Sequence, residues 1–168
     1  MTTIELPCLT IRQPWAGFIM MGKKPVENRS WSHKYCGPML IHSSQGRNFP
    51  DVPVKYYKAA GLSPDDLDHY RWWPEFQTGV ILGVVRKCTC VFKPRAVQTP
   101  SIWHDRGYCW WPMLTAAMFD QPIRYRGQLG VFQAEIDLKT SLAAGGTLGD
   151  YMAEYDKVKQ REVFNVRK

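Results

Sequence analysis

Three charged side chains, Lys24, Glu27 and Arg29, lie within one six-residue segment. Pro25 stands after the first of them and disfavours a helix, because it lacks an N–H donor and forces the preceding residue into extended geometry. In an extended strand alternate side chains point to the same side, so Glu27 and Arg29 are expected to be neighbours on one surface. The spacing therefore predicts a compact charged group on a strand.

A carboxylate beside two cations suits two kinds of chemistry. Glu27 could act as a general base on a water molecule while Lys24 or Arg29 stabilises the developing oxyanion. Alternatively, Glu27 and Arg29 form an ion pair that orients the site, and Lys24 contacts a phosphate group as a point charge. Both interpretations stay open on the sequence alone, and Lys24 and Glu27 are catalytic candidates only under the first.

A short helix is expected directly before this charged group. Pro14 suits the first position of a helix, and Gly22 suits the position just past its end. The two-turn helix between them would place Trp15, Phe18 and Ile19 on one face, where core packing is their default role.

Apolar alternation and turn residues mark the strands that follow. The segments that read as strands are 39–43, 79–92, 109–114 and 131–135. Gly83, inside the second of these, would let the strand coil or would admit a close backbone, as at the corner of a barrel. The pattern predicts a single α+β domain over residues 1–168, with a small β-barrel of five or six strands.

Two further helical segments are expected outside these strands. Residues 50–78 read as a helical insertion, with Ser63 as the cap of one helix. The C-terminal helix, over residues 146–163, begins with Thr147 and Asp150 in a variant of the capping box, and its apolar residues follow helical spacing. We expect this helix to pack on the domain.

Composition and charge narrow the class of protein. The 168 residues are 45% hydrophobic, which excludes a disordered chain, and 22 Lys and Arg against 15 Asp and Glu give a net charge of +7. Such a balance favours a polyanionic partner: RNA, with DNA also possible. The longest uncharged apolar stretch contains Pro112 and is too short for a membrane span, and no secretory signal is recognisable, so we expect a cytoplasmic protein without a membrane partner.

Basic residues concentrate in two runs, either of which could instead be an ordinary solvated surface. One surrounds the charged group described above, and the other contains Arg86, Lys87, Lys93 and Arg95.

The cysteines indicate reduced thiols rather than disulfides. Five cysteines at irregular spacings do not form a disulfide framework, and we expect buried thiols. A zinc site is the weaker interpretation, because the four side chains that could build it lack the usual Cys-x-x-Cys spacing; they are His33, Cys36, Cys88 and Cys90. No nucleotide-cofactor or metalloprotease motif is present, so no cofactor is expected.

The chain has more tryptophan residues than the core of a domain of this size usually contains. We therefore expect at least one of them to stack on a nucleobase. The candidates are Trp31, Trp72, Trp73, Trp103, Trp110 and Trp111. Trp110 and Trp111 are adjacent on an expected strand and must point to opposite faces, which predicts that only one of them is in the core.

Two motifs carry a resemblance to a known family. The segments LTIRQPWA (residues 9–16) and GKKPVENRSW (residues 22–31) resemble the ASCH domain family. Residues 37–44, 79–83 and 122–130 resemble later stretches of the same family in the expected order, so the resemblance covers residues 6–136. It implies a PUA-like β-barrel with an RNA-related role.

The resemblance also implies a cleft beside the early helix that binds RNA or a modified nucleoside. The residues expected to bind there are Gln13, Trp15, Lys24, Glu27, Arg29, Trp31 and Ser43.

Alternatively, the resemblance implies a metal-independent hydrolase. Some members of the family remove the acetyl group of 4-acetylcytidine with a lysine, a threonine and a distant glutamate. Lys24 matches the lysine, whereas Glu27 occupies the threonine position and has no hydroxyl to attack an amide. Other members are ribonucleases, in which a charged clamp on the phosphate would assist cleavage.

Overall fold

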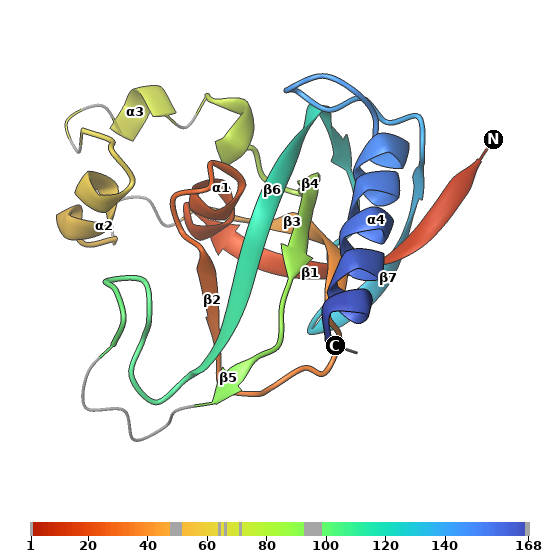
Figure 1. Ribbon diagram of the computed structural model, residues 1–168. Coiled ribbons are helices and arrows are strands. Elements are labelled where there is room, and N and C mark those ends of the chain that lie inside the picture. The colour runs from red at the N-terminus through yellow and green to blue at the C-terminus, as the bar shows by residue number, and fades with distance from the viewer. Residues whose placement is uncertain are drawn as a thin grey trace.

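The computed structural model describes residues 2–47, 52–63, 65, 67–70, 72–92 and 99–166 (Figure 1). Its strands are β1 (Thr3–Gln13), β2 (Val26–Arg29), β3 (Gly37–Arg47), β4 (Val80–Lys87), β5 (Val91–Phe92), β6 (Cys109–Arg124) and β7 (Val131–Asp137). Its helices are α1 (Trp15–Met20), α2 (Val54–Ala59), α3 (Leu67–Tyr70), the 3-10 helix η3 (Pro74–Phe76) and α4 (Leu148–Val166).

The strands form one mixed, seven-stranded sheet in the order β2-β6-β4-β3-β1-β7, with β5 paired to β6. β1 runs parallel to β3, and the other neighbours are antiparallel. The mixed α+β class is confirmed, but the expected barrel is wrong: within the described residues the sheet is open. A closed barrel needs hydrogen bonds between the end strands, whereas β2 pairs only with β6, over four residues, and β7 pairs only with β1.

Gly83 fits the close backbone approach that the sequence predicts. A Cβ atom there would lie 2.3 Å from the carbonyl oxygen of Ala117 on β6 and 2.7 Å from Cε of Met20 on α1. The absence of a side chain at this position therefore lets α1 lie directly on the sheet at the β4–β6 pair.

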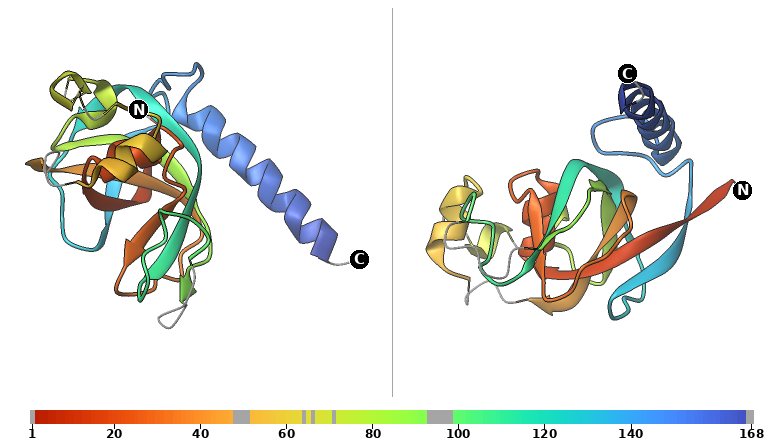
Figure 2. Two further views of the ribbon diagram at one scale, coloured as in Figure 1. Left: turned by 90° about the vertical axis from the view of Figure 1, so that its left-hand side faces the viewer. Right: turned by 60° about the horizontal axis from the view of Figure 1, so that its bottom comes forward.

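The helix α1 is buried on nearly all sides rather than on one face. Ile19 packs in the core cluster against the sheet, whereas Phe18 packs in a second cluster with the insertion, and half-buried Trp15 contacts both. The predicted single core face was too simple, because the insertion covers the side of α1 that faces away from the sheet (Figures 1 and 2).

The segment 52–76 supplies this second core. Its aromatic rings meet Phe18 edge-on, at centroid distances of 5.6 Å for Tyr57 and 6.0 Å for Phe76. The Ser63 hydroxyl accepts a hydrogen bond from the Asp65 N–H, although the helix that follows begins only at Leu67.

Both Trp110 and Trp111 are buried, so the prediction that only one lies in the core was wrong. Trp111 belongs to the sheet-side cluster, and Trp110 belongs to the cluster under the insertion. At Trp110 and Trp111, β6 separates two cores, and both faces of the strand are covered there.

The C-terminal helix α4 lies on the opposite side of the molecule from α2 and α3 and projects away from the body (Figure 2). The Asp150 carboxylate accepts hydrogen bonds from the N–H and the hydroxyl of Thr147, at 2.8 and 2.9 Å, as the variant capping box predicts. Leu148 is fully buried, and Tyr151 and Met152 pack beside it. The first turns therefore hold α4 on the domain.

Candidate functional site

Lys24, Glu27 and Arg29 form a continuous charged group. Lys24 Nζ donates to Glu27 Oε2 at 2.9 Å and also to the carbonyl of Val26, and Arg29 Nε lies 3.1 Å from Glu27 Oε1. Arg29 Nη2 donates to the carbonyl of Thr10 at 2.8 Å. Lys24 and Glu27 are only 4% and 8% exposed, so the carboxylate between its two cations is largely shielded from water.

Local signals in the sequence place this group. The backbone passes Gly22 at φ +69°, and the N–H groups of Lys23 and Lys24 then donate to the carbonyl of Phe18 at 2.9 and 3.0 Å. The strand β2 follows at once and aligns Glu27 with Trp111 and Arg29 with Cys109 on β6. Glu27 and Arg29 are in contact, which confirms the expectation that they lie on one surface.

An aromatic pocket of about 130 Å³ adjoins the charged group. It is lined by Trp15, Lys24, Glu27, Asn28, Tyr56, Trp103 and Asp105. The Tyr56 ring meets Trp15 edge-on at 4.9 Å and lies 5.6 Å from Trp103, with Lys55 Nζ 5.0 Å from its centroid. The pocket therefore combines ring faces with an ammonium group and two carboxylates.

Asn28 fixes the loop that carries one of these carboxylates. Its Nδ2 donates to the carbonyl of Trp103 at 2.9 Å, and its Oδ1 accepts from the N–H of Asp105 at 3.1 Å. Partial burial raises the pKa of Asp105, and Lys24 and Glu27 act on it in opposite directions. Burial, with the charge of Lys24 adding to it, lowers the pKa of the neighbouring His104.

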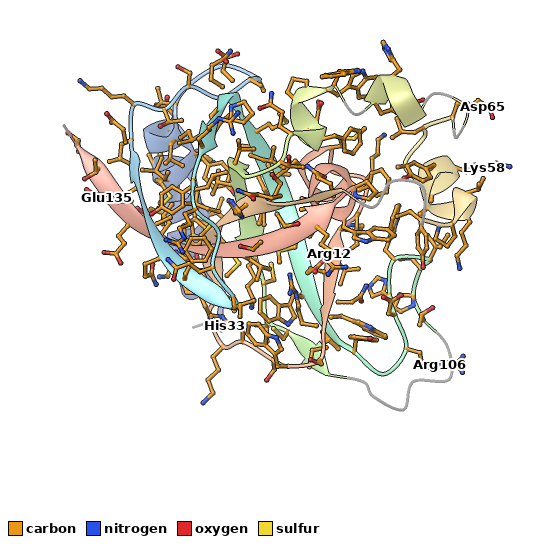
Figure 3. All side chains as sticks on the ribbon, turned by 180° about the vertical axis from the view of Figure 1, so that it is seen from behind. Arg12, His33, Lys58, Asp65, Arg106 and Glu135 are labelled. Carbon is orange, nitrogen blue, oxygen red and sulfur yellow. The ribbon has the colours of Figure 1, made fainter. Side chains whose placement is uncertain are left out.

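A second pocket, of about 390 Å³, shares Trp15, Glu27 and Asn28 with the aromatic pocket; we call it the arginine pocket. Its other lining residues are Thr10, Ile11, Arg12, Arg29, Ser44, Gln128, Leu129 and Gly130. Arg12, near the end of β1, is exposed (Figure 3). The two adjoining pockets form one cleft.

Three of the candidate binding residues lie outside the lining of this cleft. Gln13 is fully buried, and its amide donates to the carbonyls of Glu75 and Gln77 at 2.7 and 2.9 Å and accepts from the N–H of Gly17. The structure thus places Gln13 where it ties the insertion to α1.

The other two are Ser43 and Trp31. Ser43 is buried, and its hydroxyl donates to the carbonyl of Val80 at 3.2 Å. Trp31 is partly exposed and meets Trp111 edge-on at 4.6 Å. Ser44, the next residue after Ser43, lines the arginine pocket instead.

Sequence reasoning missed three lining residues, Asn28, Tyr56 and Asp105, because no local pattern marks them. Asn28 directly follows Glu27 on the edge strand β2, and both residues line both pockets of the cleft. Tyr56 and Asp105 come from distant segments that only the tertiary fold brings to the cleft.

His42 is a buried core histidine with a partner at each ring nitrogen. It is 2% exposed, with its ring nitrogens 3.2 Å from the Thr10 hydroxyl and 3.1 Å from the carbonyl of Tyr125. Burial lowers its pKa.

The second basic run is not a surface patch where the structure describes it. Lys87 is fully buried beneath the Trp111 ring, and its Nζ donates to the carbonyls of His33, Tyr35 and Cys88 at 3.0, 2.6 and 3.0 Å. Lys93 and Arg95 lie outside the described residues.

All five cysteines are free thiols, but they are not all buried: Cys8 and Cys109 are, whereas Cys36 is exposed and the other two are intermediate. Cys36 Sγ contacts the Thr89 hydroxyl, and Cys90 Sγ donates to the carbonyl of His33. Across the described ranges, no three His, Cys, Asp or Glu side chains are grouped to hold a metal ion. The weaker zinc interpretation therefore receives no support.

No helix in the described part of the chain combines the length and the apolar character that crossing a membrane requires.

Comparison with known proteins identifies the family. The model of the ASCH domain matches residues 9–101, which include α1, the charged group, the insertion and the strands β3 and β4. No curated protein matches the chain. The match spans more than half of the 168 residues and includes both motifs that carry the resemblance, so the chain belongs to the ASCH domain family.

Proposed function

We propose that the chain binds RNA and takes one nucleobase, plain or modified, into the aromatic pocket. The observation that carries the proposal is the lining of this pocket, where Trp15 and Tyr56 present ring surface beside Lys24 and Asp105. Proteins recognise unpaired RNA bases by stacking on aromatic rings and by hydrogen bonds to the base edges. The pocket offers both kinds of group, and the family suggests an RNA-related role.

The adjoining arginine pocket supports phosphate binding next to the base. Arg29 keeps 25% of its side chain exposed while its Nη2 is held by the carbonyl of Thr10. Arg12, which is exposed, lines the same pocket. Guanidinium groups suit phosphate oxygens because they present several N–H donors in a planar fork.

A stacking variant tests the proposal. Tyr56→Leu removes a ring from the aromatic pocket, and Tyr108→Leu removes an exposed tyrosine that does not line it. Stacking contributes about 1–3 kcal/mol per base, so Tyr56→Leu is expected to weaken binding of single-stranded RNA about 5- to 150-fold. Tyr108→Leu should bind as the unmodified protein does.

Fluorescence anisotropy with labelled RNA measures both affinities, and circular dichroism confirms that each variant is folded. Equal affinities of the two folded variants, or no RNA binding by the unmodified protein, would refute the proposal.

Hydrolysis without a metal is the second candidate, favoured by the presence of Lys24, Glu27 and Asp105 in one pocket. In this route Glu27 takes a proton from water, and the hydroxide attacks the acetyl carbon of 4-acetylcytidine. Lys24 stabilises the oxyanion, and Asp105 protonates the amino nitrogen as the C–N bond breaks, which releases acetate and cytidine. The raised pKa of Asp105 suits a proton donor.

Mass spectrometry of free 4-acetylcytidine and of an RNA pool tests this candidate. Asp105→Asn is the matched variant, because Asp105 is exposed and the substitution leaves the buried charged group intact. Deacetylation or strand cleavage by the unmodified protein alone, told apart by product mass, supports hydrolysis; absence of product from both proteins refutes it.

A further inference from the structure

The arginine pocket continues beyond the cleft, into a groove that the proposed function does not use. It shares Thr10, Ser44, Gln128 and Leu129 with a third pocket, of about 370 Å³. That pocket in turn shares residues 125–129 with a fourth, of about 820 Å³, whose lining also includes Arg124. A groove therefore runs from the aromatic pocket to the loop after β6.

Beyond the arginine pocket, the charged side chains of the groove are all positive. Arg12, Arg124 and Arg126 line it and are exposed, and no described residue forms an ion pair with any of the three. The third and fourth pockets have no acidic residue in their lining. Unpaired guanidinium groups in a row suit a ligand with regularly spaced negative charges.

The wall of the groove is held in a fixed position. A Cβ atom on Gly127 would lie 2.4 Å from Cε1 of buried His42 and 3.1 Å from the Thr10 hydroxyl, so the loop backbone rests directly on the strands. The Tyr125 ring stacks on Phe132 at 6.1 Å, which holds the loop from the other side. The arginines at 124 and 126 therefore project from a supported backbone.

A buried hydroxyl group in the groove is unsatisfied. The hydroxyl oxygen of Ser44, which lines both the arginine pocket and the third pocket, is buried and has no hydrogen-bond partner among the described residues. A buried hydroxyl without a partner costs free energy, which a ligand with a donor or acceptor at this point would recover.

We infer that the groove binds a strand of RNA that extends from the base in the aromatic pocket, with successive phosphates beside Arg12, Arg126 and Arg124. This inference rests on the proposed function and specifies its ligand: an unpaired segment of about three nucleotides or more, rather than a free nucleoside. Arginine contacts to phosphate position a strand without reading its sequence, so the affinity depends on length more than on sequence outside the pocket.

The affinity of the unmodified protein for a mononucleotide, a trinucleotide and a hexanucleotide of RNA tests the inference. We expect the affinity to rise from one to three nucleotides. Arg126→Gln should weaken hexanucleotide binding more than mononucleotide binding, and should reduce the slope of log K against log[salt] by about 0.7, the value for one phosphate contact on a single strand. Lys58→Gln is the control, because Lys58 points away from the domain on the outer side of α2 (Figure 3).

The outcomes separate this inference from the proposed function. Equal affinity for one and six nucleotides would overturn the groove but leave base binding in place. An unchanged salt slope in Arg126→Gln would also overturn it. Absence of binding at every length would overturn both, and preferential binding of a DNA hexanucleotide would overturn the assignment to RNA.

Discussion

Replacing Glu27 by glutamine keeps the shape of the side chain but removes the negative charge that lies between two cations. Lys24 Nζ would then be a buried ammonium group with the Val26 carbonyl and an amide oxygen as acceptors. Arg29 would face the amide N–H₂ group at the position where it now meets Glu27 Oε1. Removing one partner of a buried ion pair costs about 3–5 kcal/mol, because the other charge stays buried without compensation.

The lower end of this range applies here. The Arg29 side chain is 25% exposed, so water compensates part of the lost interaction with Glu27. Lys24 keeps its hydrogen bond to the Val26 carbonyl. A cost of about 3 kcal/mol corresponds to a fall in Tm of about 6–12 °C for a domain of this size. Urea denaturation gives the free energy of unfolding directly, and a thermal melt followed by circular dichroism gives Tm.

Two comparisons identify the cause. In a Lys24→Met background the ammonium is gone, so Glu27→Gln should cost about 2 kcal/mol less than in the unmodified protein. Glu154→Gln removes a carboxylate from an exposed ion pair with Lys157, 3.7 Å apart, and should change Tm very little. A Glu27→Gln protein as stable as Glu154→Gln would refute the assignment of a stabilising, buried charged group.

Three further predictions concern other parts of the fold. Gly83→Ala is expected to destabilise by about 3 kcal/mol in urea denaturation, since the new Cβ would lie 2.3 Å from the Ala117 carbonyl oxygen; a loss below about 1 kcal/mol would contradict this contact. Because the pKa of His42 is lowered in the folded state, its contribution to stability is present above the unfolded value of about 6.5 and is lost as pH falls below it. His42→Gln should flatten the dependence of unfolding free energy on pH between 7 and 5, and an unchanged dependence would refute the assignment. Thr147→Ala should cost about 1 kcal/mol and increase proteolysis near the start of α4, because Thr147 and Asp150 cap that helix; unchanged proteolysis would show that the cap is not needed.

The charged group could be predicted from sequence because its signals are local. Gly22 ends the helix, Pro25 enforces an extended backbone, and the two-residue period of a strand then brings Glu27 and Arg29 together. Each of these effects acts within a few residues, where backbone geometry decides the outcome.

The remaining features depend on contacts between distant segments. Tyr56 and Asp105 join the pocket through an insertion and a loop whose positions follow from the second core. The same core explains why Trp110 is buried along with Trp111. A barrel closes only when the two end strands of the sheet pair with each other. No local pattern in β2 or β7, the end strands here, predicts whether they pair.

The order of strands determines the smallest part of the chain that can carry the site. The matched family segment ends at residue 101, before β6 and β7. Without β6, the strand β2 that carries Glu27 and Arg29 would have no neighbour to pair with, and β4 would lose one of its two. Without β7, one edge of β1 would be unpaired. A fragment cut at the end of the matched segment would contain every residue of the two motifs and yet lack the strand that holds the charged group in place, so studies of this site require the chain through β7 at least.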